Sequence, residues 1–410
     1  LFVLASQLLR RAITLNGNMA GDLARGAALG ASSATLAAVL LMRKYLREEL
    51  RPPLLIHSPM DERLEDDRRL LQEVKLLLRD YWPHPVLEFS GYISTFYSGL
   101  WAVMPSMHGV GQLEHVTLSD GGEVSLHWYD PPTAPRGNRI LLVLPGLNNA
   151  SRTSFVQATM RHLRSEGFQA VALNYRGLTS SLKTPKLACA ASWVDIQEVA
   201  QHIQKVKPNS ELFGLGFSLG GGMLLRHLGS EGGNTLFKAA VTVAAPVDFP
   251  AASLALESSR RKLFMNFMVS TGAKAFMLKG IINSKFRHLV DFRRVLLATR
   301  LSQIEEALVR PVMGFPNPLE YYKANDPRVL LQNISVPTLV VNAEDDPVIS
   351  INTLPFEELK RNPRIYVAVT KRGGHIGWGS GGLGAGAWTD AMAAHFLQAC
   401  GEPSRPSARL

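Results

Sequence analysis

Short apolar runs alternate with helix-like segments from residue 139 to residue 249, and this alternation is the strongest constraint on the fold. The run RILLVLPG (139–146) has no polar interruption after its first residue, as expected of a strand buried on both faces. Helical apolar spacing follows, and similar runs recur at 169–177, 211–217 and 237–249. The pattern predicts an α/β fold with a mostly parallel central sheet and helices on both faces. Functional groups should then lie beyond the carboxyl ends of the strands.

The segments around this pattern define the predicted domain organisation. A length of 410 residues allows one large domain with appendages. Alternating apolar and polar residues on both sides of Asp120-Gly121-Gly122 predict a hairpin, and the runs VPTLVVNA and RIYVAVT resume the sheet later in the chain. The predicted parts are an N-terminal segment (1–50), an irregular extension (51–112), a first core part (113–249), a helical cap insertion (250–335), a second core part (336–402) and a tail (403–410).

Positive charge is concentrated in the predicted cap. The formal net charge, 44 − 34 = +10, admits nucleic acid, an anionic membrane surface or an acidic substrate as a partner. Ten Lys and Arg residues lie between Arg260 and Arg300 among apolar runs, with Asp291 as the only acidic residue there. This mixture favours a membrane surface over nucleic acid, which would require exposed stacking aromatics and a recognisable binding module. A solvated helical face explains the charge equally well, and we expect no nucleic-acid partner.

An uncharged stretch occupies residues 26–42 and ends at Arg43-Lys44. As a helix it would reach about 26 Å, slightly less than a hydrocarbon core of about 30 Å. Three interpretations compete: a single-pass membrane anchor, an organellar transit-like segment, and an amphipathic helix packed on a domain. We favour the anchor, in an endomembrane, over a cytosolic or organellar protein. Basic residues flank the stretch on both sides and leave its orientation open.

Metal and cofactor motifs are not found. The two cysteines, Cys189 and Cys400, have no partner at C-x-x-C or His/Cys ligand spacing, and we interpret each as a small buried apolar residue. The glycine-rich stretch 211–222 does not match the dinucleotide motif G-x-G-x-x-G, because Leu219 stands at the third glycine position. No lysine follows these glycines as a phosphate-binding P-loop requires. We therefore predict neither a metal nor a cofactor.

The same stretch contains the pattern G-x-S-x-G at residues 216–220, centred on Ser218. In a nucleophile elbow, the serine lies on a tight turn between a strand and a helix, and the small flanking residues leave room for the backbone. The match lies between a predicted strand and a predicted helix, which makes it far more specific than the five residues alone. Ser218 is therefore the candidate nucleophile, in preference to a serine that only forms a turn.

A serine hydroxyl needs a histidine base, and the histidine needs a carboxylate that fixes its tautomer. The order expected after Ser218 is acid and then histidine, each following a later strand. Asp345 and Asp346 follow the run VPTLVVNA, and His375 follows the last predicted strand. We choose Asp346 as the acid because it lies three residues beyond the small residue Ala343, and we interpret Asp345 as a supporting loop residue.

Two backbone N–H groups are candidates for an oxyanion hole. The first belongs to Leu219, directly after the serine. The second belongs to Leu147, in the turn after the LLVLPG run, with Asn148 nearby. Such donors stabilise the negative oxygen of a tetrahedral intermediate.

Together these residues resemble the α/β-hydrolase superfamily and, within it, the AB hydrolase type 4 group. This group includes abhydrolase-domain-containing phospholipases, plant embryogenesis-associated proteins, and yeast ethanol acyltransferase and monoacylglycerol lipase proteins. The resemblance runs from about Leu118 to Leu397, in the motifs SDGGEVSLHW, LPGL, NYRG, CAAS, GFSLGGG, EYYKANDP, AEDDP and RGGHIGW. Where group members often show Phe-Asp-Glu, this chain has Ile304-Glu305-Glu306.

The resemblance implies an α/β-hydrolase fold with a helical cap, and Ser218, Asp346 and His375 as the charge-relay residues. It also implies a serine hydrolase that cleaves lipid carboxylic esters through an acyl-enzyme, as a short- or medium-chain carboxylesterase, an acylglycerol lipase or a phospholipase. Two alternatives stay open. An acyltransferase would pass the acyl group to an alcohol at the same three residues, and a non-catalytic member would only bind lipid.

Overall fold

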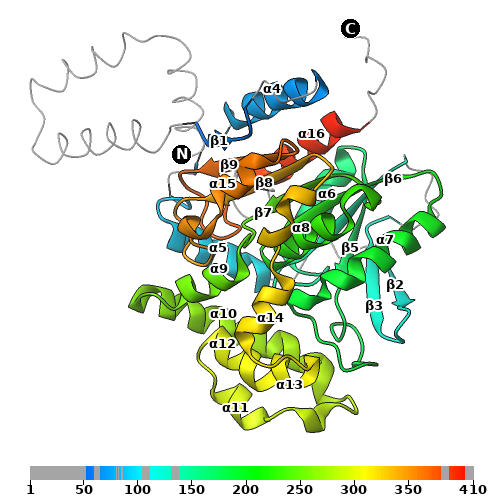
Figure 1. Ribbon diagram of the computed structural model, residues 1–410, viewed down its shortest axis with the longest axis vertical. Coiled ribbons are helices and arrows are strands. Elements are labelled where there is room, and N and C mark those ends of the chain that lie inside the picture. Colours follow the sequence, from blue (N-terminus) through cyan, green and yellow to red (C-terminus); the bar gives the residue numbers. More distant parts are fainter. Residues whose placement is uncertain are drawn as a thin grey trace, which may run out of the picture. The chain divides into compact units, whose positions relative to one another are not determined.

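The computed structural model describes residues 52–59, 65–79, 81, 83–84, 86–103, 111–130, 138–379 and 387–401. Within these residues the chain forms a nine-stranded sheet in the order β1-β9-β8-β7-β6-β4-β5-β3-β2, with helices on both faces (Figure 1). The strands are β1 (Leu54–Ile56), β2 (Gln112–Thr117), β3 (Glu123–Trp128), β4 (Arg139–Leu144), β5 (Gln169–Asn174), β6 (Glu211–Phe217), β7 (Phe237–Val243), β8 (Thr338–Ala343) and β9 (Ile365–Thr370).

The strands from β9 to β5 in this order run parallel to one another. The edge strands pair antiparallel: β1 with β9, β3 with β5, and β2 with β3 in the predicted hairpin. The prediction of a mostly parallel sheet is thereby confirmed. Because β4 and β6 are neighbours, the turns that follow them lie at the same edge of the sheet.

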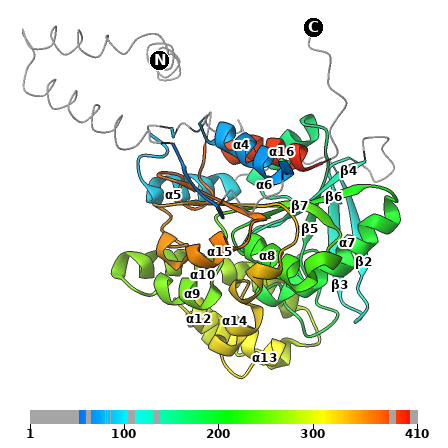
Figure 2. The same cartoon turned by 45° about the horizontal axis from the view of Figure 1, so that its top comes forward.

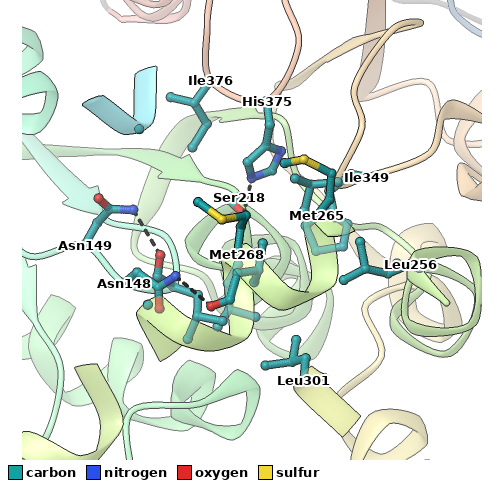
Figure 3. Close-up of a pocket in the computed structure, with 18 of the residues that line it drawn as sticks. Asn148, Asn149, Ser218, Leu256, Met265, Met268, Leu301, Ile349, His375 and Ile376 are labelled. Atoms are coloured by element: carbon teal, nitrogen blue, oxygen red, sulfur yellow. Dashed lines mark hydrogen bonds between the residues drawn. The ribbon is translucent and has the colours of Figure 1, made fainter. Parts of the chain in front are cut away.

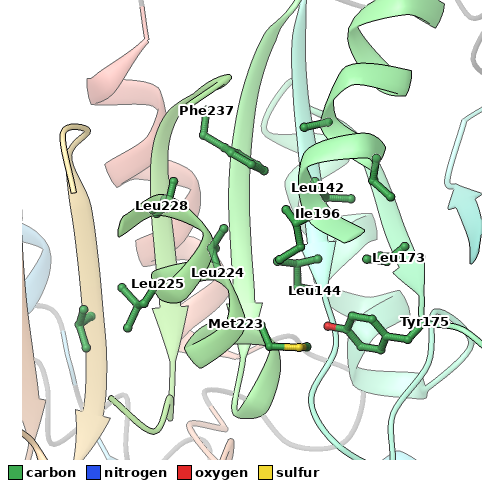
Figure 4. Close-up of a cluster of buried hydrophobic side chains, with 14 of the residues drawn as sticks. Leu142, Leu144, Leu173, Tyr175, Ile196, Met223, Leu224, Leu225, Leu228 and Phe237 are labelled. Atoms are coloured by element: carbon green, nitrogen blue, oxygen red, sulfur yellow. The ribbon is translucent and has the colours of Figure 1, made fainter. Parts of the chain in front are cut away.

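Side chains of the central strands alternate between two apolar layers, because successive residues of a strand point to opposite faces. Leu142 and Leu144 of β4 belong to the layer that Figure 4 shows, where they pack near Ile196 and Leu224. Leu141 and its neighbours on the other face pack against a second group of helices. Full burial of one such leucine contributes about 1.5–3 kcal/mol to stability.

Each face of the sheet has its own set of helices, which Figure 2 shows on opposite sides of the strands. One set consists of α4 (Glu65–Arg79), α6 (Ser154–Ser165) and α16 (Trp388–Cys400). The other set includes α7 (Asp195–Val206), α8 (Leu219–Glu231) and α15 (Phe356–Arg361), with the short η2 (Ala190–Val194), η3 (Gly232–Asn234) and η7 (Ile351–Thr353).

The chain between β7 and β8 is helical, as the sequence predicts. Its elements are α9 (Phe249–Leu256), α10 (Arg260–Ile282), η4 (Arg287–Leu289), α11 (Phe292–Leu297), α12 (Leu301–Ile304), the π-helix η5 (Glu305–Val309), α13 (Arg310–Met313), α14 (Pro318–Asn325) and η6 (Arg328–Asn333). Their buried apolar cluster, which includes Met277, Ile281 and Leu308, is shared with residues between β5 and α7. The exact limits of the predicted domains stay predictions.

The segment before the hairpin is more regular than predicted. In place of an irregular extension, it contains β1, α4 and α5 (Gly91–Val103). Helix α4 was missed although its apolar residues, among them Leu70, Val74 and Leu78, are spaced for one helical face and are buried. Helix α5 was missed because its residues are mostly small or aromatic, without a charged face.

The predicted single-pass anchor requires correction. Among the residues that the structure describes, no helix is both long enough and apolar enough to cross a bilayer. The stretch 26–42, on which the prediction depended, lies outside the described residues. Its length and Ala- and Gly-rich composition gave only a weak signal for a membrane span. The anchor is therefore not supported.

Candidate active site

Ser218 lies in the tight turn between β6 and α8, with φ 48° and ψ −122°. A positive φ is unfavourable for a residue with a side chain and marks a locally strained turn. Neighbouring hydrogen bonds hold this conformation: the Ser218 N–H donates to Val243 O at 2.8 Å, and Ser218 O accepts from Gly221 N at 2.9 Å. The local geometry is that of the predicted nucleophile elbow.

Close backbone contacts account for the glycines on either side of Ser218. A Cβ atom at Gly216 would lie 2.5 Å from Gly221 Cα, and one at Gly220 would lie 2.2 Å from Leu144 O. Both obstacles are backbone atoms, which cannot rotate away as a side chain can. Larger residues at these positions would therefore displace the turn that carries the serine.

His375 connects Ser218 to a carboxylate. Its Nε2 lies 2.9 Å from Ser218 Oγ, and its Nδ1 lies 2.8 Å from Asp346 Oδ2. The other carboxylate oxygen, Oδ1, accepts the backbone N–H groups of Val348 at 2.7 Å and Ile349 at 2.9 Å. The Asp346 side chain is fully buried, so these bonds fix its orientation. The structure thus brings together three residues that are 157 and 29 positions apart in sequence.

The neighbouring Asp345 makes different contacts. Its Oδ1 accepts the Gly374 N–H at 2.9 Å, and its Oδ2 lies 3.5 Å from Arg372 Nη1. Burial raises the pKa of Asp345 above its ordinary value, while the bonds to Gly374 and Arg372 oppose this rise. Asp345 therefore supports the loop that carries His375, and Asp346 contacts the imidazole itself.

The two predicted oxyanion donors both line the cavity in front of Ser218. Leu219 is the first residue of α8, where N–H groups have no intrahelical acceptor. Neither its amide nor that of Leu147 has an acceptor among the described residues. The turn after β4 runs against the serine, since a Cβ at Gly146 would lie 3.0 Å from Ser218 Cβ. Asn148, with φ 71°, points its side-chain amide to Val269 O at 3.2 Å.

The cavity has a volume of about 580 Å³ and a mainly apolar lining. Figure 3 shows His375 above Ser218, with the cap residues Met265 and Met268 beside them. Side chains come from α5, from the turn after β4, from α9, α10 and α14 of the cap, and from the loop after β8; they include Phe96, Leu100, Leu256, Met265, Met268 and Ile349. A cavity of this kind can enclose an apolar chain next to the serine.

The family follows from comparison of the sequence with known proteins. Residues 139–377 match the family model described as alpha/beta hydrolase fold. The chain belongs to the alpha/beta hydrolase fold family. The matched range contains Ser218, Asp346 and His375, and it ends two residues after the histidine.

Relatives of this hydrolase-fold chain include proteins with names that refer to lipid hydrolysis. Phospholipase ABHD3 from Homo sapiens is 30% identical over 276 residues, which cover 65% of this chain and 66% of the relative. The chain thus spans slightly less than two thirds of that relative's length. Embryogenesis-associated protein EMB8 from Picea glauca is 27% identical over 83% of this chain and 76% of its own. Monoacylglycerol lipase ABHD2 from Homo sapiens is 26% identical, covering 80% of this chain and 81% of its own.

Helix α5 contributes site residues that the sequence interpretation missed. The His375 N–H donates to Thr95 Oγ1 at 2.9 Å, and Ser98 Oγ donates to His375 O at 2.9 Å. Gly91 at the start of the helix packs on Asp345 O, where a Cβ would lie at 1.7 Å. The available signal was the helical spacing of these small residues on one face. Positive φ angles at Gly373 and Gly374 allow the histidine loop to turn toward this helix.

Metal-ligating groups do not cluster in the described part of the chain, where no three His, Cys, Asp or Glu residues are arranged to hold an ion. Cys189 is buried in the cavity wall, and burial raises the pKa of its thiol to about 12, so the unreactive protonated form prevails. Cys400 is half-buried at the end of α16.

Proposed function

We propose that this chain is a serine hydrolase that cleaves carboxylic esters of lipids. One observation carries the proposal: His375 is hydrogen-bonded to both Ser218 Oγ and Asp346 at the wall of an apolar cavity. In this mechanism Ser218 Oγ attacks the ester carbonyl carbon while His375 Nε2 takes the hydroxyl proton. The alcohol leaves with that proton, and an acyl-serine remains. Water, deprotonated by His375, then releases the acid and restores the serine.

Asp346 and two backbone amides have supporting roles in this scheme. The carboxylate accepts the Nδ1–H of His375 and stabilises the imidazolium that forms after proton transfer. The N–H groups of Leu219 and Leu147 are proposed to bind the negative oxygen of the tetrahedral intermediate. Each such donor contributes about 3–4 kcal/mol to transition-state stabilisation in serine hydrolases.

Two features support a lipid ester as the substrate. The cavity lining is mainly apolar, and its volume of about 580 Å³ suits an acyl chain better than a polar ester. The names of the relatives, phospholipase and monoacylglycerol lipase, refer to lipid esters. We therefore propose acylglycerols or phospholipids with short or medium chains as the substrate class.

The outer rim of the cavity supports contact with the lipid aggregate that presents the substrate. Phe96 and Phe264, from α5 and α10, have ring centroids 6.2 Å apart and are both about half exposed. Met268 and Leu100 extend this exposed apolar rim. Such residues favour insertion into the acyl boundary of a lipid surface. Co-sedimentation with anionic lipid vesicles tests the contact, and Phe96→Ser with Phe264→Ser should abolish it if this rim is the contact surface.

The serine hydrolase proposal is tested with an active-site probe. A fluorophosphonate should label the full chain, and Ser218→Ala should abolish both labelling and ester hydrolysis. The matched control is Ser180→Ala, because Ser180 bonds to Glu123 away from the cavity and its loss should leave labelling unchanged. Undiminished labelling of Ser218→Ala would refute the assignment of the nucleophile.

Acyl transfer to an alcohol requires the same three residues, so the distinction depends on the products. In the presence of ethanol or glycerol, a hydrolase releases mainly free acid and a transferase mainly the new ester. We propose hydrolysis because it accords with the relatives' names. The three bonded side chains also argue against a member of the family that only binds lipid.

A further inference from the structure

Among the described residues, one carboxyl group lines the cap side of the cavity. Glu305 is the first residue of the π-helix η5, and although it lines the cavity its exposed fraction is 5%. Short π-helical segments are often found at functional sites. The proposed hydrolytic steps do not use this side chain, and placing a carboxyl group in an apolar cavity costs free energy unless it is hydrogen-bonded.

Tyr322 of α14 is the hydrogen-bond partner of this carboxyl. Its hydroxyl lies 2.5 Å from both Glu305 oxygens and can donate its one proton to either of them. No other hydrogen-bond partner of Glu305 is present among the described residues, and no lysine, arginine or histidine there forms an ion pair with it. Tyr322 supplies one proton only. A protonated Glu305 carries an O–H of its own, which can donate to a ligand in the cavity.

The surroundings of Glu305 favour this protonated form. Burial, and to a lesser degree the negative charge of Glu257 after α9, raise its pKa to about 8, while the bond from Tyr322 opposes the rise. The other titratable groups that face it are Tyr321 and Cys189, and burial raises the pKa of both, so they are uncharged. At neutral pH Glu305 is thus mainly a neutral acid, which donates as well as accepts.

We propose that Glu305, held by Tyr322, is a polar subsite that binds a second, non-reacting oxygen atom of the ester substrate. The group it would recognise is an acceptor oxygen, such as an ether, a carbonyl or a hydroxyl, in the alcohol part or along the acyl chain. The inference rests on the proposed esterase function and concerns its selectivity. Glu305 is a specificity-determining residue and takes no part in bond breaking.

Matched pairs of esters test the subsite in the full-length chain. In each pair one CH₂ group is replaced by an ether oxygen, which only accepts hydrogen bonds, for example a butyl and a 2-methoxyethyl ester of the same acid. A second series moves the ether along the acyl chain, so that the two series distinguish the two sources of the oxygen. The quantity measured is the ratio of kcat/KM for the ether to kcat/KM for its alkyl partner. This ratio cancels any effect common to both substrates.

Three variants are compared with the wild-type chain. Glu305→Leu removes the donor and should lower the ratio about tenfold for at least one ether position, the value expected for one lost hydrogen bond. Glu305→Gln keeps an N–H donor and should retain the wild-type preference within about threefold. Glu306→Leu is the matched control, because Glu306 pairs with Arg310 at the surface; its ratio should not change.

Ionisation of Glu305 gives an independent readout that does not require a folded leucine variant. Between about pH 6.5 and about pH 9.5, on either side of the pKa of about 8, the wild-type ratio should fall as the donor proton is lost, whereas that of Glu305→Gln should stay constant. Equal ratios for wild type and Glu305→Leu at every ether position would overturn the subsite, and so would an equal loss for both members of each pair. Hydrolysis of none of the esters by the wild-type chain would instead refute the proposed function.

Discussion

Replacement of Thr95 by valine should reduce catalysis, although Thr95 is not one of the three residues proposed to act on the ester. The Thr95 hydroxyl accepts the backbone N–H of His375 at 2.9 Å and donates to Gly91 O at 2.6 Å. Valine has nearly the same shape but no hydroxyl, so the variant keeps the packing of α5 and removes both bonds. The His375 N–H would lose its acceptor. Of the two hydrogen bonds that join the His375 backbone to α5 in the described part of the chain, only the one from Ser98 would remain.

The expected magnitude follows from these two bonds. A part-buried N–H that loses its acceptor costs about 1–3 kcal/mol. The loop can recover part of this cost by moving, but a movement of 1 Å at the imidazole lowers the rate by about 100-fold. We therefore expect kcat/KM to fall between about 10-fold and about 100-fold, which corresponds to about 1.4–2.7 kcal/mol. Most of the loss should occur in kcat, since Thr95 is one of many residues that line the cavity.

The assay compares ester hydrolysis and the rate of fluorophosphonate labelling in Thr95→Val, Thr95→Ser and the wild type. Serine keeps the hydroxyl and should restore activity to within about threefold. Thr271→Val is the matched control, because Thr271 bonds to Phe267 O on the exposed side of α10. A cooperative thermal unfolding transition is required of each variant, to establish that it is folded. Wild-type kcat/KM in a folded Thr95→Val, or an equal loss in Thr95→Ser, would refute the positioning role.

Two further predictions concern carboxyl groups near the site. Asp346→Asn should lower kcat by about 10⁴-fold, because an amide N–H facing His375 Nδ1 favours the wrong tautomer. Asp345→Asn keeps an acceptor oxygen for the Gly374 N–H and should lower kcat less than about tenfold. Equal losses in the two variants would show that the two roles are misassigned. Burial raises the pKa of Glu88 to about 8. Between about pH 4.5 and about pH 8, this carboxyl is therefore protonated in the folded protein and ionised in the unfolded chain. The contribution of Glu88 to the free energy of unfolding falls as the pH rises through this range. Glu88→Gln should raise Tm relative to wild type near pH 9 but not near pH 5, and an equal Tm difference at both pH values would contradict this reasoning.

Local sequence patterns were sufficient to predict the hydrolase core. The central strands are buried on both faces, so their apolar runs are unbroken, and the G-x-S-x-G pattern lies within a single turn between a strand and a helix. The order of serine, acid and histidine also follows from the alternation of strands and helices. The distances that join Ser218, His375 and Asp346 depend on the loops after three strands, which sequence spacing can order but cannot measure.

Contacts between distant segments were beyond the sequence interpretation. Nothing near Thr95 indicates a hydrogen bond to residue 375, which lies 280 positions later. Glu305 looks like any acidic residue of a helical cap, and only the fold shows that it is buried beside Tyr322. The anchor prediction depended mainly on the length and composition of one stretch, and neither separates a membrane span from other apolar stretches when the stretch is short.

The arrangement of α5 has a consequence for how the site is held together. The family match covers residues 139–377 and excludes α5. This helix nevertheless forms hydrogen bonds with both the backbone N–H and the backbone C=O of His375, and it packs against Asp345. Asp345 in turn accepts the Gly374 N–H, so the loop after β8, the loop after β9 and α5 form one hydrogen-bonded unit. Helix α5 also supplies Phe96 and Leu100 to the cavity wall. Substrate contacts and histidine position therefore depend on the same helix, and a change in α5 packing should alter selectivity and kcat together.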